Sequence, residues 1–566
     1  MNVPHAALLG ATFWLPSLTD LADIGPLLGL AGTIVAVLLA ALLFGRSAEI
    51  AAFVTLAGAA GTALLCFSAA PRAARGGWAG VAPEAAAPML VVDNFSLLFI
   101  TLICFFLVCV VGLWRIGAAA GGAEGAAHLR NGPEFFTLLT GSAFGMALMC
   151  STTNLLMILL AVEMASLPSY AIVAFRKSDR LAAEASLKYV LFGAVTSALM
   201  AYGVSLLYGY YGTLDLLSIG RMMAGDVGHP SQMGAPLILS VALFGLLAGV
   251  GFKISAVPFH FWCPDVFEGA TIEVTTWLSV ASKAAGLGLL LRVVAALVQP
   301  ADGTVLLGPL STAVGIFATL TCTIGNLAAF RQENIKRLLA YSSIAHAGYM
   351  LMAGAILWQP AVDAGAAHPA FSALIAYLVV YLFMNLGAFG CAALVFWATG
   401  KETLDAFRGL GRRAPLVAAC LAICCFSLVG LPPLGGFIAK FYLLWALYDA
   451  GLIWLVIVAV INTLISLYFY ARIAHAMYFV DDGQPAIAAP LFGRALVSAS
   501  AALLLLVGAP LAGGLKSRAD EFSRNLYPVT LRPAVAPVQL DAESEASGPR
   551  PKPRGSPAAG TGVLPE

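Results

Sequence analysis

The chain has 566 residues, of which 60% are hydrophobic and only 10% are charged, and its mean hydropathy is +0.91. These values exclude an ordinary soluble domain and indicate an integral membrane protein. Thirty Lys and Arg residues against 29 Asp and Glu residues leave a net charge of +1, so no global field predicts nucleic acid or an acidic protein as a partner.

The first 25 residues lack the basic region of a cleavable secretory signal, and they contain Asp20 and Asp23 instead. We therefore expect the first span to be retained. A membrane helix needs about 20 apolar residues, and about fourteen stretches meet that need. They are residues 26–45, 49–69, 95–116, 134–151, 154–174, 184–209, 235–262, 272–298, 304–327, 334–358, 368–398, 414–449, 451–479 and 491–515. The predicted fold class is an all-α polytopic membrane protein.

The segments between these spans alternate in basic content. One set holds Arg46, Arg115, Arg130, Arg176, Lys177, Arg180, Arg331, Lys336, Arg337, Lys401, Arg408, Arg412 and Arg413, whereas the opposite set holds only Arg72, Arg75 and Arg221. The positive-inside rule then places both termini on the periplasmic side of a bacterial inner membrane. Residues from about 516 onward are rich in Pro, Ala, Ser and Glu, which predicts a disordered tail over 516–566.

Two of the predicted spans are too long for one plain helix. Pro258 interrupts residues 235–262, and the sequence GLPPLGG at 430–436 interrupts residues 414–449. We expect both to be broken helices, because irregular backbone at membrane depth persists only where protein buries it or where it lines a wet cavity. Two such spans, each with a lysine beside the break, are typical of inverted-repeat transporters.

Four ionisable residues fall near the predicted midplane, namely Glu163, Lys253, Lys283 and Lys440. An unpaired lysine at that depth costs at least about 2.5–3.5 kcal/mol, so these groups must be compensated or functional. A lysine poised between burial and a nearby carboxylate can exchange its proton near neutral pH. With the imidazoles of His260 and His346, the chain has the parts of a proton relay.

Each of these residues also has a structural interpretation. Glu163 and Lys253 could form an ion pair that only holds two helices together, and Lys440 could bond carbonyls freed by the double proline. The two histidines could bond helix backbone. Lys188 lies only about five residues inside its helix, so it could snorkel to the interface. Snorkelling or loop contacts are favoured for three residues near span ends: Arg292, Arg472 and His475.

The ten cysteines stand singly or loosely grouped in apolar segments, without a CxxC pair or metal-ligand spacing. We interpret them as small core residues. The chain also lacks a Gly-rich nucleotide loop and a pair of histidines spaced for haem. Redox energy is therefore expected to come from partner subunits.

Several strings carry a specific resemblance over roughly residues 95 to 480. They include NLLMILLAVEMASLPSYAIVAF, EASLKYVLFGAVTSALMAYG, GFKISAVPFHFWCPDVFEGA, NLAAFRQENIKRLLAYSSIAHAGYML and GLPPLGGFIAKFYLL. These closely resemble the subunit N family of the proton-pumping NADH:quinone oxidoreductase, respiratory complex I. Two features depart from that family's pattern: GATIEVT at 269–275 introduces Glu273 where a proline is common, and Ala439 replaces a glycine.

The resemblance implies fourteen helices with two inverted five-helix repeats, each containing a broken helix. It divides the chain into N-terminal helices (1–130), a first repeat (131–300), a second repeat (301–480), a last helix (481–515) and the tail. It implies a proton path through Glu163, Lys188, Lys253, Lys283 and Lys440, with His260 and His346 along the same axis. It also implies no cofactor in this chain, while FMN, iron–sulfur clusters and quinone are expected in partner subunits of the complex.

The sequence thus predicts a proton-translocating membrane subunit of NADH:quinone oxidoreductase, coupled to quinone reduction elsewhere in the complex. A subunit of a monovalent cation/proton antiporter, or of a membrane-bound hydrogenase, is the alternative. A purely structural anchor would not need lysines at membrane depth.

Overall fold

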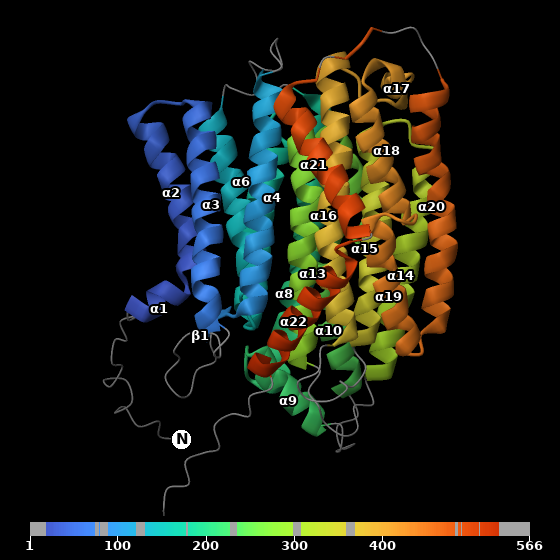
Figure 1. Ribbon diagram of the computed structural model, residues 1–566. Helices are drawn as coiled ribbons and strands as arrows, with labels where there is room; N and C mark the ends of the chain where they lie inside the picture. The colour runs from blue at the N-terminus through green and yellow to red at the C-terminus, as the bar shows by residue number, and fades with distance from the viewer. Residues whose placement is uncertain are drawn as a thin grey trace, which may run out of the picture. The chain divides into compact units, whose positions relative to one another are not determined.

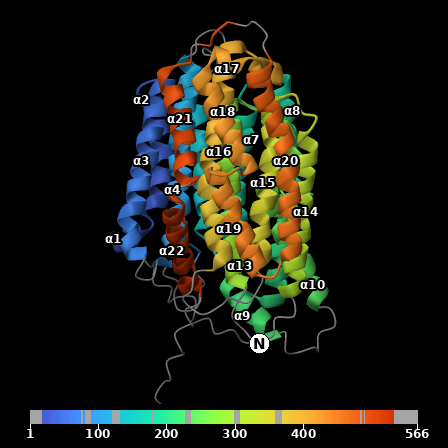
Figure 2. The same ribbon diagram turned by 45° about the vertical axis from the view of Figure 1, so that its right-hand side comes forward.

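The computed structural model describes residues 18–73, 78–79, 89–119, 131–176, 179–226, 235–297, 307–357, 368–480, 485–487, 489–508 and 510–530. Residues Met1–Thr530 form one compact unit. Within it, long helices run side by side as a bundle, and the short helices α9 and α17 lie at its two opposite ends (Figures 1 and 2). The predicted basic residues Arg75, Arg130 and Lys177, and the tail from residue 531, lie outside the described residues.

The elements follow in chain order. They are α1 (Leu18–Asp23), α2 (Gly25–Leu43), α3 (Ala48–Ala73), β1 (Trp78–Ala79), β2 (Val91–Val92), α4 (Asn94–Ala119), α6 (Gly132–Cys150), α7 (Leu155–Val173), α8 (Arg180–Tyr211), α9 (Leu216–Asp226), α10 (Ala235–Ile254), α11 (Trp262–Gly269), α12 (Ile272–Trp277), the π-helical η2 (Leu278–Ser282), α13 (Lys283–Leu297), α14 (Leu307–Ala329), α15 (Ile335–Leu357), α16 (Pro369–Thr399), the 3₁₀ turn η3 (Leu404–Phe407), α17 (Leu410–Arg413), α18 (Pro415–Val429), α19 (Gly435–Asp449), α20 (Ile453–Phe479), α21 (Leu491–Gly508) and α22 (Ala512–Thr530).

The all-α membrane fold is confirmed. Among the described residues, 12 helices are long and apolar enough to cross a membrane. The other two predicted spans correspond to α15, which is more polar, and to the broken pair α18 and α19. A short antiparallel ribbon, in which Trp78 pairs with Val92 and Ala79 with Val91, is a small addition to the helices. The inverted symmetry of the two repeats and the domain boundaries after residues 130, 300 and 480 remain predictions.

Local signals explain where several helices begin and end. The side chain of Asn154 accepts hydrogen bonds from the amides of Leu156 and Met157 and so caps α7, and Asp179 caps α8 in the same manner. Proline stands in the first turn of α2, α6, α16 and α18, where its missing N–H costs nothing.

Both predicted helix breaks are confirmed. α10 ends at Ile254, and the chain then runs without helical structure to α11, which begins at Trp262. Ser255, a buried residue, adopts φ +65° at this break, a conformation that costs a non-glycine residue energy. At the second break α18 ends at Val429 and α19 begins at Gly435, with Gly430 at φ +89° closing α18.

One part of the predicted disordered tail is wrong. α22 continues to Thr530, well inside the segment from 516 onward. Its sequence is poor in apolar residues, but Ala519 and Ser523 are buried where α22 packs along α16 and α4. The Ser523 hydroxyl accepts a hydrogen bond from the His368 amide at 2.9 Å. Tertiary contacts of this kind stabilise a helix that its own composition does not favour.

Candidate functional site

The lysines predicted at membrane depth are buried. The side chains of Lys253, Lys283 and Lys440 are 1%, 0% and 6% exposed. Lys253 lies in the last turn of α10, directly before the first break, and Lys440 lies in α19, in the second turn after the second break. Lys283 is the first residue of α13, directly after the π-helical turn η2. The breaks and the buried amines therefore coincide.

Within the described part of the chain, the amines of Lys253 and Lys283 have no hydrogen-bond partner. Lys283 lies over the ring of Phe267, 5.4 Å from its centroid. Keeping a buried ammonium without a carboxylate in contact is costly. The charge of such an amine therefore depends strongly on neighbouring charges.

Glu163 and Lys253 do not form a direct ion pair among the described residues. The Glu163 carboxylate accepts a short hydrogen bond from the Ser197 hydroxyl of α8. No ion pair joins it to Lys253 among the described residues, although the carboxylate is near enough to act electrostatically on that amine. Among the described residues, Glu163 is therefore held by Ser197 and leaves the Lys253 amine free of direct contact.

Lys440 makes the contact expected from its structural interpretation. Its amine donates a hydrogen bond to the Val429 carbonyl at 2.9 Å, and this carbonyl is one of those left free where α18 ends. The same amine lies 4.3 Å from the centroid of the Tyr349 ring, a favourable cation–π geometry. Lys440 thus bridges the two halves of the broken helix while facing α15.

Between Lys283 and Lys440 lies a continuous row of aromatic, hydroxyl and imidazole groups. The Tyr381 hydroxyl donates to the Ser343 hydroxyl at 2.9 Å and lies 3.3 Å from the Ser279 carbonyl of η2. The His346 ring packs 5.3 Å from the Tyr381 ring and 5.9 Å from the Tyr349 ring. The row therefore connects the turn before Lys283 with the ring beneath Lys440.

The two predicted histidines occupy different surroundings. His346 Nδ1 is 2.8 Å from the Tyr377 hydroxyl, inside the row. His260 lies in the first break, 6% exposed, and its Nδ1 has no hydrogen-bond partner among the described residues. The structure therefore brings His346 together with Lys283 and Lys440, whereas His260 belongs with the break that follows Lys253.

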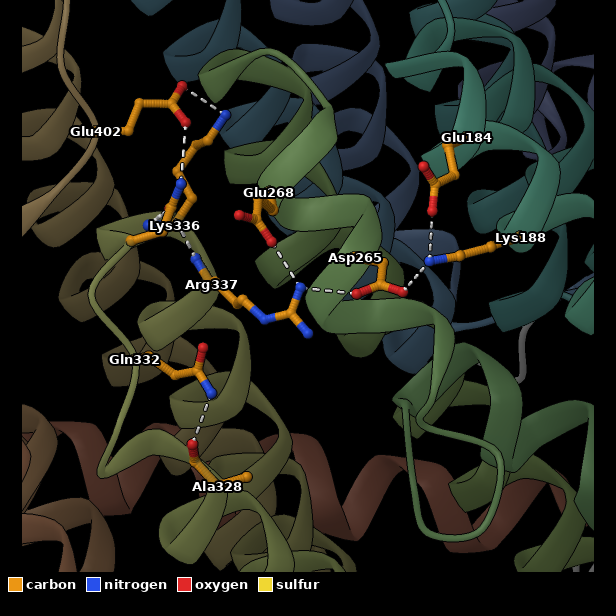
Figure 3. Close-up of polar contacts among 10 residues, drawn as sticks. Glu184, Lys188, Asp265, Glu268, Ala328, Gln332, Lys336, Arg337 and Glu402 are labelled. Atoms are coloured by element: carbon orange, nitrogen blue, oxygen red, sulfur yellow. Dashed lines mark hydrogen bonds and ion pairs between the residues drawn. The ribbon is translucent and has the colours of Figure 1, made fainter. Parts of the chain in front are cut away.

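Lys188 is placed apart from the buried amines. Its side chain is 39% exposed, and its amine contacts Asp265 at 2.7 Å and Glu184 at 2.9 Å (Figure 3). Asp265 and Glu268 of α11 are also paired with Arg337 of α15, at 2.7 Å and 2.6 Å. Burial by itself raises the pKa of the Asp265 carboxyl, but the hydrogen bonds and charges of Lys188 and Arg337 outweigh burial and hold that pKa below its usual value.

Of the two alternatives predicted for Arg292, snorkelling does not occur, whereas a contact with a connecting segment does, because Asp93 lies between β2 and α4. This side chain is fully buried and forms a two-pronged ion pair with Asp93, with Arg292 Nη1 2.6 Å from a carboxylate oxygen. Arg472 makes the predicted loop contacts, because it donates to the carbonyls of Phe330 and Gln332. His475 stacks on Phe479, 5.5 Å between centroids.

Sequence reasoning missed four carboxylates that pair with basic side chains. Asp93 pairs with Arg292, Asp265 with Lys188, Glu268 with Arg337 and Glu402 with Lys336. The strings quoted above contain Asp265 and Glu268, but their partners lie on other helices, at distances along the chain that no periodicity reveals. Glu273, which departs from the family pattern, is 1% exposed in α12. All ten cysteines are free and buried, which agrees with their interpretation as core residues.

An apolar pocket of about 330 Å³ lies beside the first break, between α10 and α14. Phe244, Val257 and Phe317 are among its lining residues, and the lining contains no titratable side chain. The pocket therefore suits a hydrocarbon group. Its lining offers no titratable group that could exchange a proton, unlike the buried amines.

The fold and the site define a multi-pass membrane protein with buried amines at two helix breaks, a class that carries ions or protons. Comparisons agree with this. A family model described as NADH:quinone oxidoreductase/Mrp antiporter, TM, matches residues 152–466. NADH-quinone oxidoreductase subunit N of Anaeromyxobacter sp. (strain Fw109-5) is 43% identical over 374 residues, which is 63% of this chain and 70% of that protein. Subunit N of Desulfovibrio desulfuricans (strain ATCC 27774 / DSM 6949 / MB) is 36% identical over 504 residues, which is 87% of this chain and 94% of that protein.

Solved structures extend the likeness. A chain of respiratory complex I from Thermus thermophilus with bound Aureothin is 32% identical, with a TM-score of 0.68, and the match covers 87% of this chain and 98% of that one. A chain of the Mrp complex from Dietzia sp. DQ12-45-1b shares the fold at 20% identity, with a TM-score of 0.73, over 90% of this chain and 98% of that one. The chain belongs to the NADH:quinone oxidoreductase/Mrp antiporter transmembrane family, in the branch of NADH-quinone oxidoreductase subunit N.

Proposed function

We propose that this chain is the proton-translocating membrane subunit of an NADH:quinone oxidoreductase. One observation carries the proposal: Lys253 and Lys283 are buried at helix interruptions, and among the described residues their amines have no hydrogen-bond partner. Amines held in this way change protonation when a neighbouring charge changes, because charges interact by several kcal/mol at low effective dielectric.

The proposed path runs from Lys253, modulated by Glu163 and with His260 in the adjoining break, to Lys283 of α13. It continues along the row of Tyr381, Ser343 and His346, and it ends at Lys440 beside the second break. Quinone reduction in partner subunits would supply the change of charge that starts the transfer. Each amine then responds to the protonation state of the one before it.

The remaining expectations belong to this proposal. The partners are the other membrane and peripheral subunits of the complex, which hold FMN, iron–sulfur clusters and the quinone. The chain lies in a bacterial inner membrane with both termini periplasmic. The clustering of Arg331, Lys336, Arg337 and Lys401 near the ends of neighbouring spans supports this orientation.

The test uses the assembled complex in inside-out membrane vesicles, where NADH oxidation and proton uptake are measured together. Lys253→Ala is expected to abolish most proton uptake while the chain still co-purifies with its partners. Lys401→Ala, at an exposed lysine near the basic end of the bundle, is the matched control and is expected to pump normally. Normal proton uptake by the Lys253→Ala complex would reject the relay.

A subunit of a monovalent cation/proton antiporter is the second candidate, because the chain shares its fold with a chain of the Mrp complex. Sodium or potassium dependence of transport in the same vesicles distinguishes the two. Transport that is unchanged when either cation is removed supports the proton-translocating subunit.

A further inference from the structure

The short helix α11 is held between α8 and α15 by charged contacts. Asp265 accepts from Lys188 of α8 at 2.7 Å and from Arg337 of α15 at 2.7 Å, and Glu268 accepts from Arg337 at 2.6 Å (Figure 3). We refer to these four residues as the Asp265 clamp. A single carboxylate thus joins a helix of the predicted first repeat to a helix of the predicted second.

A second contact from the first turn of α15 secures the other end of α11. The amine of Lys336, which is 1% exposed, donates to the Ala270 carbonyl directly after α11 at 2.9 Å. The same amine pairs with Glu402 at 2.6 Å (Figure 3). α15 therefore holds α11 at two positions, and charged networks of several members stabilise more than isolated surface pairs do.

Further contacts of α11 reach the buried amines of Lys253 and Lys283. The indole N–H of Trp262 donates to the carbonyl of Phe252, the residue before Lys253, at 3.2 Å. Phe267 presents its ring to Lys283. α11 packs closely against α8, because a Cβ at Gly269 would lie only 2.6 Å from Ala185 Cβ. A shift of α11 therefore changes the surroundings of Lys253 and Lys283 together.

We propose that Asp265 is a positioning residue that fixes α11 against both repeats, and that Lys188 acts as its ion-pair partner and not as a proton carrier. The proposal rests on the proposed function. Lys188 differs from Lys253, Lys283 and Lys440 because two carboxylates contact its amine and its side chain is 39% exposed. Releasing its proton would break both ion pairs at once.

Arginine distinguishes the two roles of Lys188, because it keeps the charge and the hydrogen bonds of lysine but does not release its proton in a protein. The experiment uses the assembled complex in inside-out vesicles and reports protons taken up per NADH oxidised, with assembly checked by co-purification. Lys188→Arg is expected to keep this ratio within about twofold of the parent, whereas Lys188→Gln and Asp265→Asn are each expected to lower it by about tenfold.

The double variant Lys188→Gln/Asp265→Asn is expected to be no worse than Asp265→Asn alone, because both changes break the same contact. Asp265→Glu, which keeps the charge, is expected to recover part of the ratio and covers the case in which Asp265→Asn fails to assemble.

Loss of pumping in Lys188→Arg as complete as in Lys188→Gln, in a complex that assembles, would overturn the proposal, and so would additive losses in the double variant. The matching change Lys253→Arg addresses the proposed function separately. It is expected to stop pumping, and if it pumps normally the relay fails whatever Lys188→Arg does.

Discussion

Arg292 and Asp93 form a fully buried ion pair between α13 and the residue directly before α4, although 199 positions separate them in the chain. The arginine also donates to the Cys150 carbonyl at 3.0 Å and lies over the Phe95 ring. Removing one partner leaves an uncompensated charge in the bundle. Arg292→Met is therefore expected to lower the free energy of unfolding by about 3–5 kcal/mol.

Thermal unfolding of the detergent-solubilised complex measures this loss. The double variant Asp93→Leu/Arg292→Met is the control, and it is expected to recover most of the stability because it removes both charges. The single variant Asp93→Leu is measured as well. If the double variant loses as much stability as Asp93→Leu and Arg292→Met lose together, the pair does not act as a unit.

Gly436 allows a close approach of α19 to α18 at the second break. A Cβ there would lie 1.8 Å from the Ser427 carbonyl oxygen of α18, and backbone cannot move aside cheaply. Gly436→Ala is expected to destabilise the protein by at least about 1–3 kcal/mol and to separate Lys440 from Val429. Gly61→Ala, at a helical glycine with open space around it, is expected to unfold at the parent's temperature or above. Equal melting temperatures for the two variants would contradict this packing.

The Tyr381 hydroxyl joins η2 to α15 through its contacts with the Ser279 carbonyl and the Ser343 hydroxyl. Tyr381→Phe removes a hydrogen bond to Ser343, worth about 0.5–1.5 kcal/mol, while keeping the ring in place. We expect the complex to assemble and its proton uptake per NADH to fall several-fold. Tyr442→Phe, which removes a hydroxyl bonded to the carbonyl of Ala512, the first residue of α22, serves as the control and is expected to pump normally.

His368 caps α16 and contacts α22, and burial lowers its pKa to about 4. Its Nδ1 accepts from the Ala370 amide, which requires the neutral ring. Because the unfolded histidine has a pKa near 6.5, stability contributed by the neutral ring is present above about pH 6.5 and is lost as pH falls toward 4. Hydrogen exchange of α22 is expected to accelerate between pH 6.5 and 4.

His368→Asn is the matched variant, because asparagine also caps helices but does not titrate. In this variant the exchange of α22, corrected for the intrinsic effect of pH, is expected to stay constant over the same interval. An unchanged acceleration would assign the pH dependence to another group.

The sequence predicted the spans and both breaks, because apolar length and proline are local signals. Burial of Lys253, Lys283 and Lys440 followed from their depth within those spans. The hydrogen-bond and ion-pair partners of the charged residues were harder to predict. Glu163 accepts a hydrogen bond from Ser197, Arg292 pairs with Asp93, and Lys188 pairs with Asp265 on another helix. Which helices become neighbours is a tertiary property, and one sequence does not encode it in a readable period. The same reason explains α22, whose few apolar residues mattered only because α16 and α4 cover them.

The π-helical turn η2 carries a consequence for Lys283. A π turn holds one more residue than an α turn, so every side chain after Ser282 is rotated about the helix axis by the extra residue. If Leu278–Ser282 wound as ordinary α-helix with no residue removed, the Lys283 amine would swing by about 100°, away from Phe267 and the Tyr381 row. A helix that looks intact in its length and hydrophobicity would then hold its lysine on the wrong side.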